Sequence, residues 1–182
     1  TILDKHESAV RSVATSLDGR WIASGSRDKN IRIWDMEGNC AQILSGHSAE
    51  IRSLSFHPDG LELASSSCDT TIRIWSLSNG ELIREIKGHK ADVRSVNYSH
   101  DGKYLVSGSV DKSICIWDSS TGKLIKKITG HEADVRTVLY HPQDMMIASG
   151  SIDRSLRVWN LKTEGENASL IGHSDYVRTV DC

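Results

Sequence analysis

A histidine recurs along this chain at nearly constant intervals, and a tryptophan follows each of the first four histidines at a fixed distance. The histidines are 41, 42, 42 and 42 residues apart, and each tryptophan comes 28 residues later. The residues are His6, His47, His89, His131 and His173, with Trp34, Trp75, Trp117 and Trp159. A period of about forty residues is typical of chains built from repeated units that bury their apolar faces against one another. We therefore expect a repeat architecture whose function depends on the assembled units.

Each unit contains four short segments with the composition of β-strands, separated by turn residues such as Asp-Gly and Thr-Gly. In the third unit, Ile114 and Ile116 alternate with other residues and point to one face of a sheet. The Ser-Gly-Ser sequences and the β-branched residues beside them disfavour a helix. We expect this unit to form strands at 93–99, 104–109, 114–117 and 124–128. A sheet this small needs neighbouring sheets to bury both of its faces.

The order of motifs in the unit is Gly-His, an Asp-Gly turn, Ser-Gly-Ser, a single Asp and Trp-Asp. This pattern resembles the WD40 repeat. Polar residues replace the last Asp in Trp75-Ser76 and Trp159-Asn160. The resemblance covers nearly the whole chain and implies an all-β fold, a WD40 β-propeller with four-stranded antiparallel blades. It places whole units at about 4–45, 46–87, 88–129 and 130–171, and the start of a further blade at 172–182.

The two ends of the chain have the pattern of incomplete units. We expect residues 1–3 to be the last strand of one blade and residues 176–180 to be the first strand of another. Residues 1–182 are then a single propeller segment of a longer protein, and the resemblance implies a parent ring of seven blades. We expect this segment alone to self-associate, because open blade faces and unpaired strand edges are adhesive.

Composition narrows the classes of function. A formal net charge of −2 gives no general attraction for nucleic acid, and no run of about eighteen apolar residues is present to span a membrane. The cysteines Cys40, Cys68, Cys115 and Cys182 lack the spacing of a zinc site or a disulfide framework. We expect reduced thiols, no cofactor and no metal, and a location in the cytoplasm, the nucleus or both.

Every unit also carries a His, a Ser and an Asp, which could be mistaken for a hydrolytic triad. An enzyme needs one such site with an oxyanion hole, whereas a scaffold needs the same brace in every blade. The resemblance implies that these three residues and the tryptophan form a buried hydrogen-bonded tetrad, so we expect no catalytic residues. The tetrads are His6, Ser24, Asp28 and Trp34; His47, Ser65, Asp69 and Trp75; His89, Ser107, Asp111 and Trp117; and His131, Ser149, Asp153 and Trp159.

In each unit, similar residues stand on either side of the first apolar position of the first strand, although forming the strand does not require them. That position holds Val10, Ile51, Val93, Val135 and Val177, and we expect its side chain to be buried and its neighbours to point away from it. The resemblance places these neighbours on the narrow face of the propeller, near the central channel. The candidate partner-binding residues are Arg11, Arg52, Arg94, Arg136 and Arg178 after that position; Glu50, Asp92, Asp134 and Tyr176 before it; and Arg27, Val110 and Ile152 before the turn aspartate.

Two interpretations of the arginines stay open. Five arginines against three acids leave about two positive charges, which could receive a carboxylate or a phosphate. Alternatively, each arginine pairs with an acid of a neighbouring blade and holds the ring together. We also expect Val110, Ile152 and Tyr176 to add exposed apolar surface, which favours a protein partner over nucleic acid.

The leading hypothesis is a non-catalytic scaffold that docks an acidic, phosphorylated or mixed peptide or domain within a multi-subunit complex. One alternative is a subunit of an RNA- or chromatin-associated complex whose arginines contact phosphate. Another is a sensor propeller attached to a catalytic domain outside this segment. The fold alone does not choose among complexes.

Overall fold

The structure is a computed structural model that describes residues 6–141, 146–161 and 166–180. These residues form sixteen strands and no helix. The strands are β1 (Val10–Thr15), β2 (Ile22–Ser26), β3 (Ile31–Trp34), β4 (Cys40–Leu44), β5 (Ile51–Phe56), β6 (Glu62–Ser67), β7 (Ile72–Ser76), β8 (Leu82–Ile86), β9 (Val93–Tyr98), β10 (Tyr104–Ser109), β11 (Ile114–Asp118), β12 (Leu124–Ile128), β13 (Val135–Tyr140), β14 (Met146–Ser151), β15 (Ser155–Asn160) and β16 (Glu166–Ile171).

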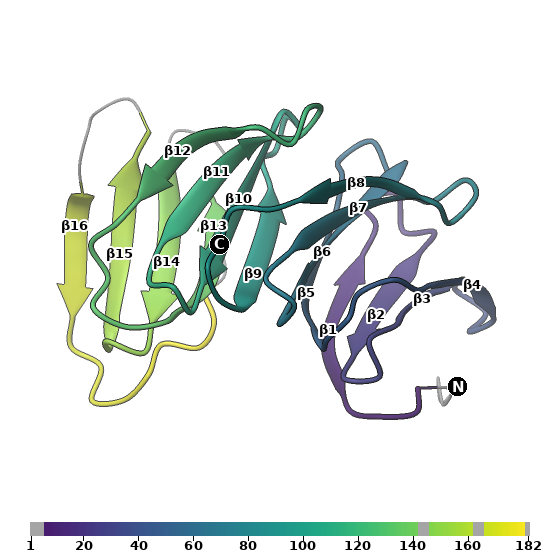
Figure 1. Ribbon diagram of the computed structural model, residues 1–182, viewed down its shortest axis with the longest axis horizontal. Coiled ribbons are helices and arrows are strands. Elements are labelled where there is room, and N and C mark those ends of the chain that lie inside the picture. Colours follow the sequence, from purple (N-terminus) through teal and green to yellow (C-terminus); the bar gives the residue numbers. More distant parts are fainter. Residues whose placement is uncertain (1–5, 142–145, 162–165, 181–182) are drawn as a thin grey trace.

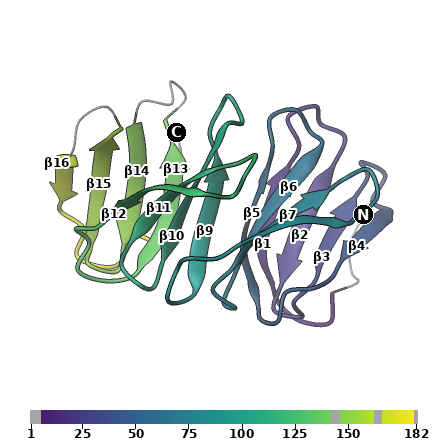
Figure 2. The ribbon, with the colours of Figure 1, turned by 45° about the horizontal axis from the view of Figure 1, so that its top comes forward.

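Consecutive groups of four strands make four antiparallel sheets, which we call blades 1 to 4. Each blade is a meander, with its first strand at one edge and its fourth at the other. The first strands β1, β5, β9 and β13 contact one another in succession, so the blades follow one another in an open arc (Figures 1 and 2). The prediction of an all-β fold with four-stranded antiparallel blades is confirmed.

The core consists of three apolar layers, one in each seam between neighbouring blades. In the first seam, Ile31 and Ile33 of blade 1 pack with Ile51 and Leu54 of blade 2. All four of these side chains are buried, because the alternating apolar residues of one blade face those of the next. Burial of this kind is the main stabilising contribution in such a sheet stack.

A small residue in each second strand lets the next blade approach closely. A side chain added at Gly108 would place its Cβ 2.7 Å from Cγ1 of Val135, and one at Gly150 would lie 2.6 Å from Cγ1 of Val177. In blade 2 the corresponding residue is Ser66, which is fully buried and whose hydroxyl has no hydrogen-bond partner among the described residues. Blade 2 therefore buries an unpaired hydroxyl at a position where blades 3 and 4 have glycine.

The turn between the second and third strands contains a residue with a positive φ that is not glycine. The values are 72° at Lys29, 73° at Thr70, 68° at Lys112 and 69° at Arg154. Each of these residues follows a tetrad aspartate, whose carboxylate accepts a hydrogen bond from the backbone two residues on. That bond fixes the turn and holds a left-handed conformation that non-glycine residues rarely adopt.

Three expectations about the ends of the chain need comment. The prediction that Val10 is buried is wrong: it is 46% exposed, because no described blade covers that face of β1. Residues 176–180 lie outside the sheets, since no described strand pairs with them, although Val177 is buried against blade 4. The strand expected at 1–3 lies outside the described residues.

Candidate functional site

Each blade brings the four predicted residues of its tetrad together. In blade 3, Trp117 Nε1 donates to Ser107 Oγ at 2.8 Å, and His89 Nε2 lies 2.7 Å from the same oxygen. Because Ser107 accepts from the indole, its own proton is left to donate to His89 Nε2. The Nδ1–H of His89 then donates to Asp111 at 3.0 Å. The same contacts recur in the other blades at 2.7–2.8 Å.

The aspartates of the tetrads are held in their ionised form. Burial alone would raise the pKa of Asp111, but hydrogen bonds from His89 and Ser113 outweigh it and hold that pKa well below its usual range. The pKa of Asp69 is lowered in the same way by His47 and Thr71 against its burial. These carboxylates are therefore fixed anions that anchor the histidine and the turn.

The tetrad serines are placed where no substrate can reach them. Ser65, Ser107 and Ser149 are fully buried, and Ser24 is 6% exposed. Each accepts a hydrogen bond from a tryptophan at 2.8 Å and lies against a histidine nitrogen. A nucleophile must be free to approach an electrophilic carbon. These hydrogen bonds join the second and third strands of each blade.

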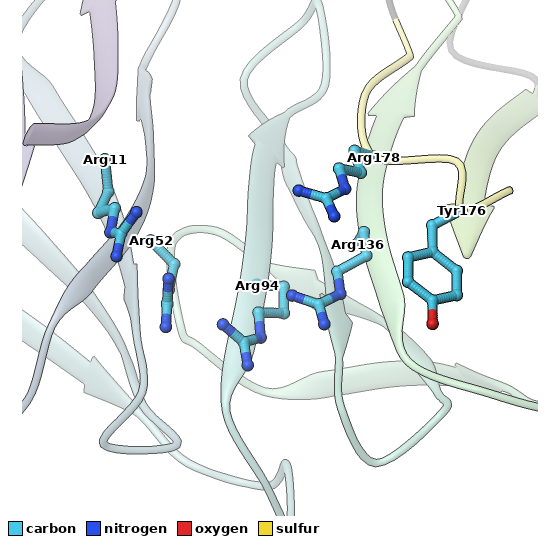
Figure 3. A pocket seen from close by; sticks show the side chains of 6 residues that line it. All are labelled: Arg11, Arg52, Arg94, Arg136, Tyr176 and Arg178. Atoms are coloured by element: carbon cyan, nitrogen blue, oxygen red, sulfur yellow. The ribbon is translucent and has the colours of Figure 1, made fainter. Parts of the chain in front are cut away.

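The predicted arginines gather around one cavity of about 360 Å³, which we call the arginine cavity (Figure 3). They come from the first strand of each blade and from the segment after β16, and their side chains line an arc. The lining residues are Arg11, Arg52, Arg94, Arg136, Tyr176 and Arg178. Tyr176 is 49% exposed and gives the cavity one aromatic wall.

A repeated backbone hydrogen bond fixes this end of the blades. The amide of Val110 donates to the carbonyl of Asp92 at 3.0 Å, and Ile152 donates to Asp134 at the same distance. The equivalent bonds join Arg27 to Ala9 and Cys68 to Glu50. Each bond ties the residue before the turn aspartate to the residue before the first strand, so both positions lie at the same end of the blade.

The acids pair with the arginines in two ways. Arg94 lies 3.2 Å from Asp92, and Arg136 lies 3.2 Å from Asp134, so these pairs join residues of one blade. Glu50 pairs with Arg52 of its own blade at 3.1 Å. It also reaches Arg27 at 3.0 Å and Arg11 at 3.8 Å, both in blade 1. Only this carboxylate, among the described residues, links arginines across a seam.

Positive charge is left over around the cavity. Arg27 and the five lining arginines make six cations, while Glu50, Asp92 and Asp134 make three anions, a formal excess of three. Arg178 has no ion pair with any carboxylate that the structure describes. Burial lowers the pKa of Arg136, and the charges of Arg94, Arg52 and Arg178 lower it further, against the opposing effect of Asp134. The guanidinium groups therefore repel one another around the cavity, and a bound anion would reduce this repulsion.

Not every candidate lies on this cavity. Val110 and Ile152 are only partly exposed and do not line it. Arg27 is 49% exposed in its side chain and reaches the site through Glu50. Cys68 holds the position equivalent to Arg27, and Arg52 Nε donates to its Sγ at 2.9 Å. Burial raises the pKa of this thiol, and the guanidinium of Arg52 only partly offsets that effect.

The described residues show neither a metal site nor a membrane-spanning helix. No group of three or more His, Cys, Asp or Glu residues within them is arranged to hold a metal ion. The described segments contain no helix with the length and apolar character needed to cross a bilayer. Cys40, Cys68 and Cys115, the cysteines that the structure describes, are free thiols.

A family comparison decides where this chain belongs. The family model described as "WD domain, G-beta repeat" matches residues 1–35, 38–76, 80–118 and 122–160. The chain belongs to the WD40 repeat family. WD40 repeats indicate a protein-interaction scaffold, and WD40 proteins are generally non-catalytic and bind other proteins. The four matches overlap the four blades, and each contains one tetrad aspartate and its tryptophan.

One curated relative of this WD40 chain is the "Ribosome biogenesis protein BOP1 homolog" of Arabidopsis thaliana. It is 46% identical over 39 residues, which are 21% of this chain and 5% of the relative. The aligned stretch is about one repeat long, so the similarity concerns a single WD40 unit.

Proposed function

We propose that this WD40 chain is part of a non-catalytic scaffold that docks an acidic or phosphorylated segment of a partner protein in the arginine cavity, within a multi-subunit complex. The observation that carries the proposal is that five arginines line one concave site of about 360 Å³, while only three carboxylates pair with the arginines there and with Arg27 among the described residues. Guanidinium groups bind carboxylate and phosphate through two parallel hydrogen bonds.

The acids beside the arginines support this role. Asp92 and Asp134 each hold one guanidinium at 3.2 Å, which limits the rotamers that a partner would otherwise have to order. Ion pairs of this kind, in partly exposed side chains, contribute little to stability by themselves. An electrostatic brace between blades would require arginine–carboxylate ion pairs across the seams, and among the described residues only those of Glu50 cross one.

A second candidate is a subunit of an RNA-associated complex whose arginines contact phosphate. The name of the Arabidopsis relative, a ribosome biogenesis protein, favours it. The aromatic content of the cavity argues against it. Proteins that bind single-stranded nucleic acid stack successive bases on several aromatic side chains, whereas Tyr176 is the one aromatic residue that lines this cavity. Binding to RNA should weaken steeply with salt, whereas a peptide held partly by apolar contacts should be less sensitive.

The same proposal includes the larger assembly. We place these four blades within a closed ring of seven, in a longer protein that acts in the cytoplasm, the nucleus or both. In such a ring another blade would cover the exposed face of Val10 and Val13. Expressed alone, the segment should self-associate through that face, and a monodisperse monomer in sedimentation would contradict this expectation.

The test compares two double variants of the full-length protein by affinity capture and quantitative mass spectrometry. Arg94→Glu with Arg136→Glu reverses two charges in the cavity. Arg20→Glu with Lys103→Glu makes the same change of charge in the turns after the first strands. Equal circular dichroism spectra show equal folding. We expect the first variant to lose partners that the second retains; identical partner sets from both variants would refute the proposed docking site.

A further inference from the structure

The first two seams are closed on their outer side by a polar clasp, a side chain of one blade's fourth strand that donates to a carbonyl of the next blade. Gln42 Nε2 of β4 donates to the Leu77 carbonyl at 2.9 Å. Arg84 Nη1 of β8 donates to the Ser119 carbonyl at 2.8 Å. The two donors occupy equivalent positions, opposite the central isoleucine of the third strand. Both acceptors come two residues after a tetrad tryptophan.

No such clasp joins the described residues of blades 3 and 4 across the third seam. Lys126 of β12 has the equivalent position, opposite Ile116, and Leu161 is equivalent to the two acceptors. Lys126 makes no hydrogen bond or ion pair with any residue that the structure describes. A cavity of about 230 Å³ lies in the seam. In Figure 1, β11 and β12 lie on the side of blade 3 next to blade 4. The cavity is lined by Tyr104, Ile116, Ile125, Lys126, Tyr140 and Leu161.

The lining of this cavity has one cation in mostly apolar surroundings. Its volume lies below the range of about 300–1,000 Å³ of small-molecule sites, so it suits an inserted side chain better than a free ligand. Exposed apolar surface continues along β12, where Leu124 is 49% and Ile125 is 53% exposed. Lys123 and Lys126 have no carboxylate partner among the described residues, so the complementary charge is negative.

We propose that this cavity docks a segment of a partner protein that inserts one apolar side chain between Tyr140 and Ile116 and pairs an adjacent Asp or Glu with Lys126. The apolar residue lies beside the position that Arg84 holds in the second seam, and the acid supplies a carboxylate that Lys126 lacks among the described residues. The site shares no lining residue with the arginine cavity, so it stands or falls independently of the docking function proposed there.

Selection from a displayed library of random linear peptides, with the full-length protein as bait, tests the proposal. We expect enrichment of peptides in which an apolar residue adjoins Asp or Glu. Their affinity should fall at least about tenfold in Ile125→Glu, which places a like charge at the mouth of the site. Ile83→Glu, at the equivalent exposed position of β8 beside the closed second seam, is the matched control and should bind as the wild type does.

Two further variants deal with misfolding of Ile125→Glu and with peptides that bind at the other cavity. Ile125→Ser removes the apolar wall without adding charge, and it replaces Ile125→Glu if that variant does not fold. Arg136→Glu identifies acidic peptides that bind in the arginine cavity instead. The proposal is overturned if no enriched peptide loses affinity in the Ile125 variants, or if Ile83→Glu weakens binding equally.

Discussion

Removing the carboxylate of Asp111 should destabilise blade 3 by an amount that its contacts determine. The carboxylate accepts hydrogen bonds from His89 Nδ1 at 3.0 Å, from the Lys90 amide at 2.9 Å, and from the Ser113 amide at 3.0 Å and hydroxyl. In Asp111→Ala the amide of Lys90 can bind water, and the hydroxyl of Ser113 can rotate. The ring N–H of His89 and the amide of Ser113 stay buried, since these residues are 7% and 1% exposed.

An unpaired buried donor costs about 1–3 kcal/mol. Two such donors, with some relief from water entering the vacated space, should lower the free energy of unfolding by about 2–4 kcal/mol. Urea denaturation of the full-length protein, followed by circular dichroism, measures this loss. Asp101→Ala is the control, because Asp101 lies in an exposed turn of the same blade, and we expect it to cost less than about 1 kcal/mol. Equal losses in the two variants would refute the tetrad as a buried brace.

The remaining predictions concern pH and two local defects. Hydrogen bonds outweigh burial and hold the pKa of Asp69, Asp111 and Asp153 below the usual value. The stability that these carboxylates contribute is therefore present above about pH 4 and is lost as the pH falls further. In an acid titration of the free energy of unfolding, Asp111→Asn should lose less stability than the wild type. Ser66→Ala should raise the free energy of unfolding by about 1–2 kcal/mol by removing a buried unpaired hydroxyl, and a lower value in urea denaturation would contradict this. Thr70→Gly should gain about 0.5–1 kcal/mol in the same assay, because a β-branched residue at φ 73° is strained; a loss of stability would contradict it.

The blades could be predicted from the spacing of the repeat, and the tetrads from its resemblance to the WD40 repeat. Equivalents of His89, Ser107 and Trp117 stand in every unit, so the geometry expected for one unit is expected for all four. The face of Val10 was predicted incorrectly for the opposite reason. Its burial depends on a neighbouring blade, and the repeat pattern does not say which units have one.

The details of both cavities depend on side-chain reach, which the repeat pattern does not encode. Glu50 occupies the same position as Asp92, but its longer side chain reaches arginines of two blades. Lys126 and Arg84 are both cations at equivalent positions, yet only the guanidinium of Arg84 forms the clasp. The open third seam therefore appears only when the blades are packed together.

The most direct test of the docking surface is photo-crosslinking from the arginine cavity in living cells. Benzoylphenylalanine in place of Tyr176, which is exposed on the cavity wall, should form adducts with a partner protein. The same replacement at Leu61, which is 63% exposed in the turn after β5, is the control and should not form those adducts. Adducts to a protein from position 176 alone are the predicted result. No protein adduct from position 176, or the same adducts from both positions, would contradict the account.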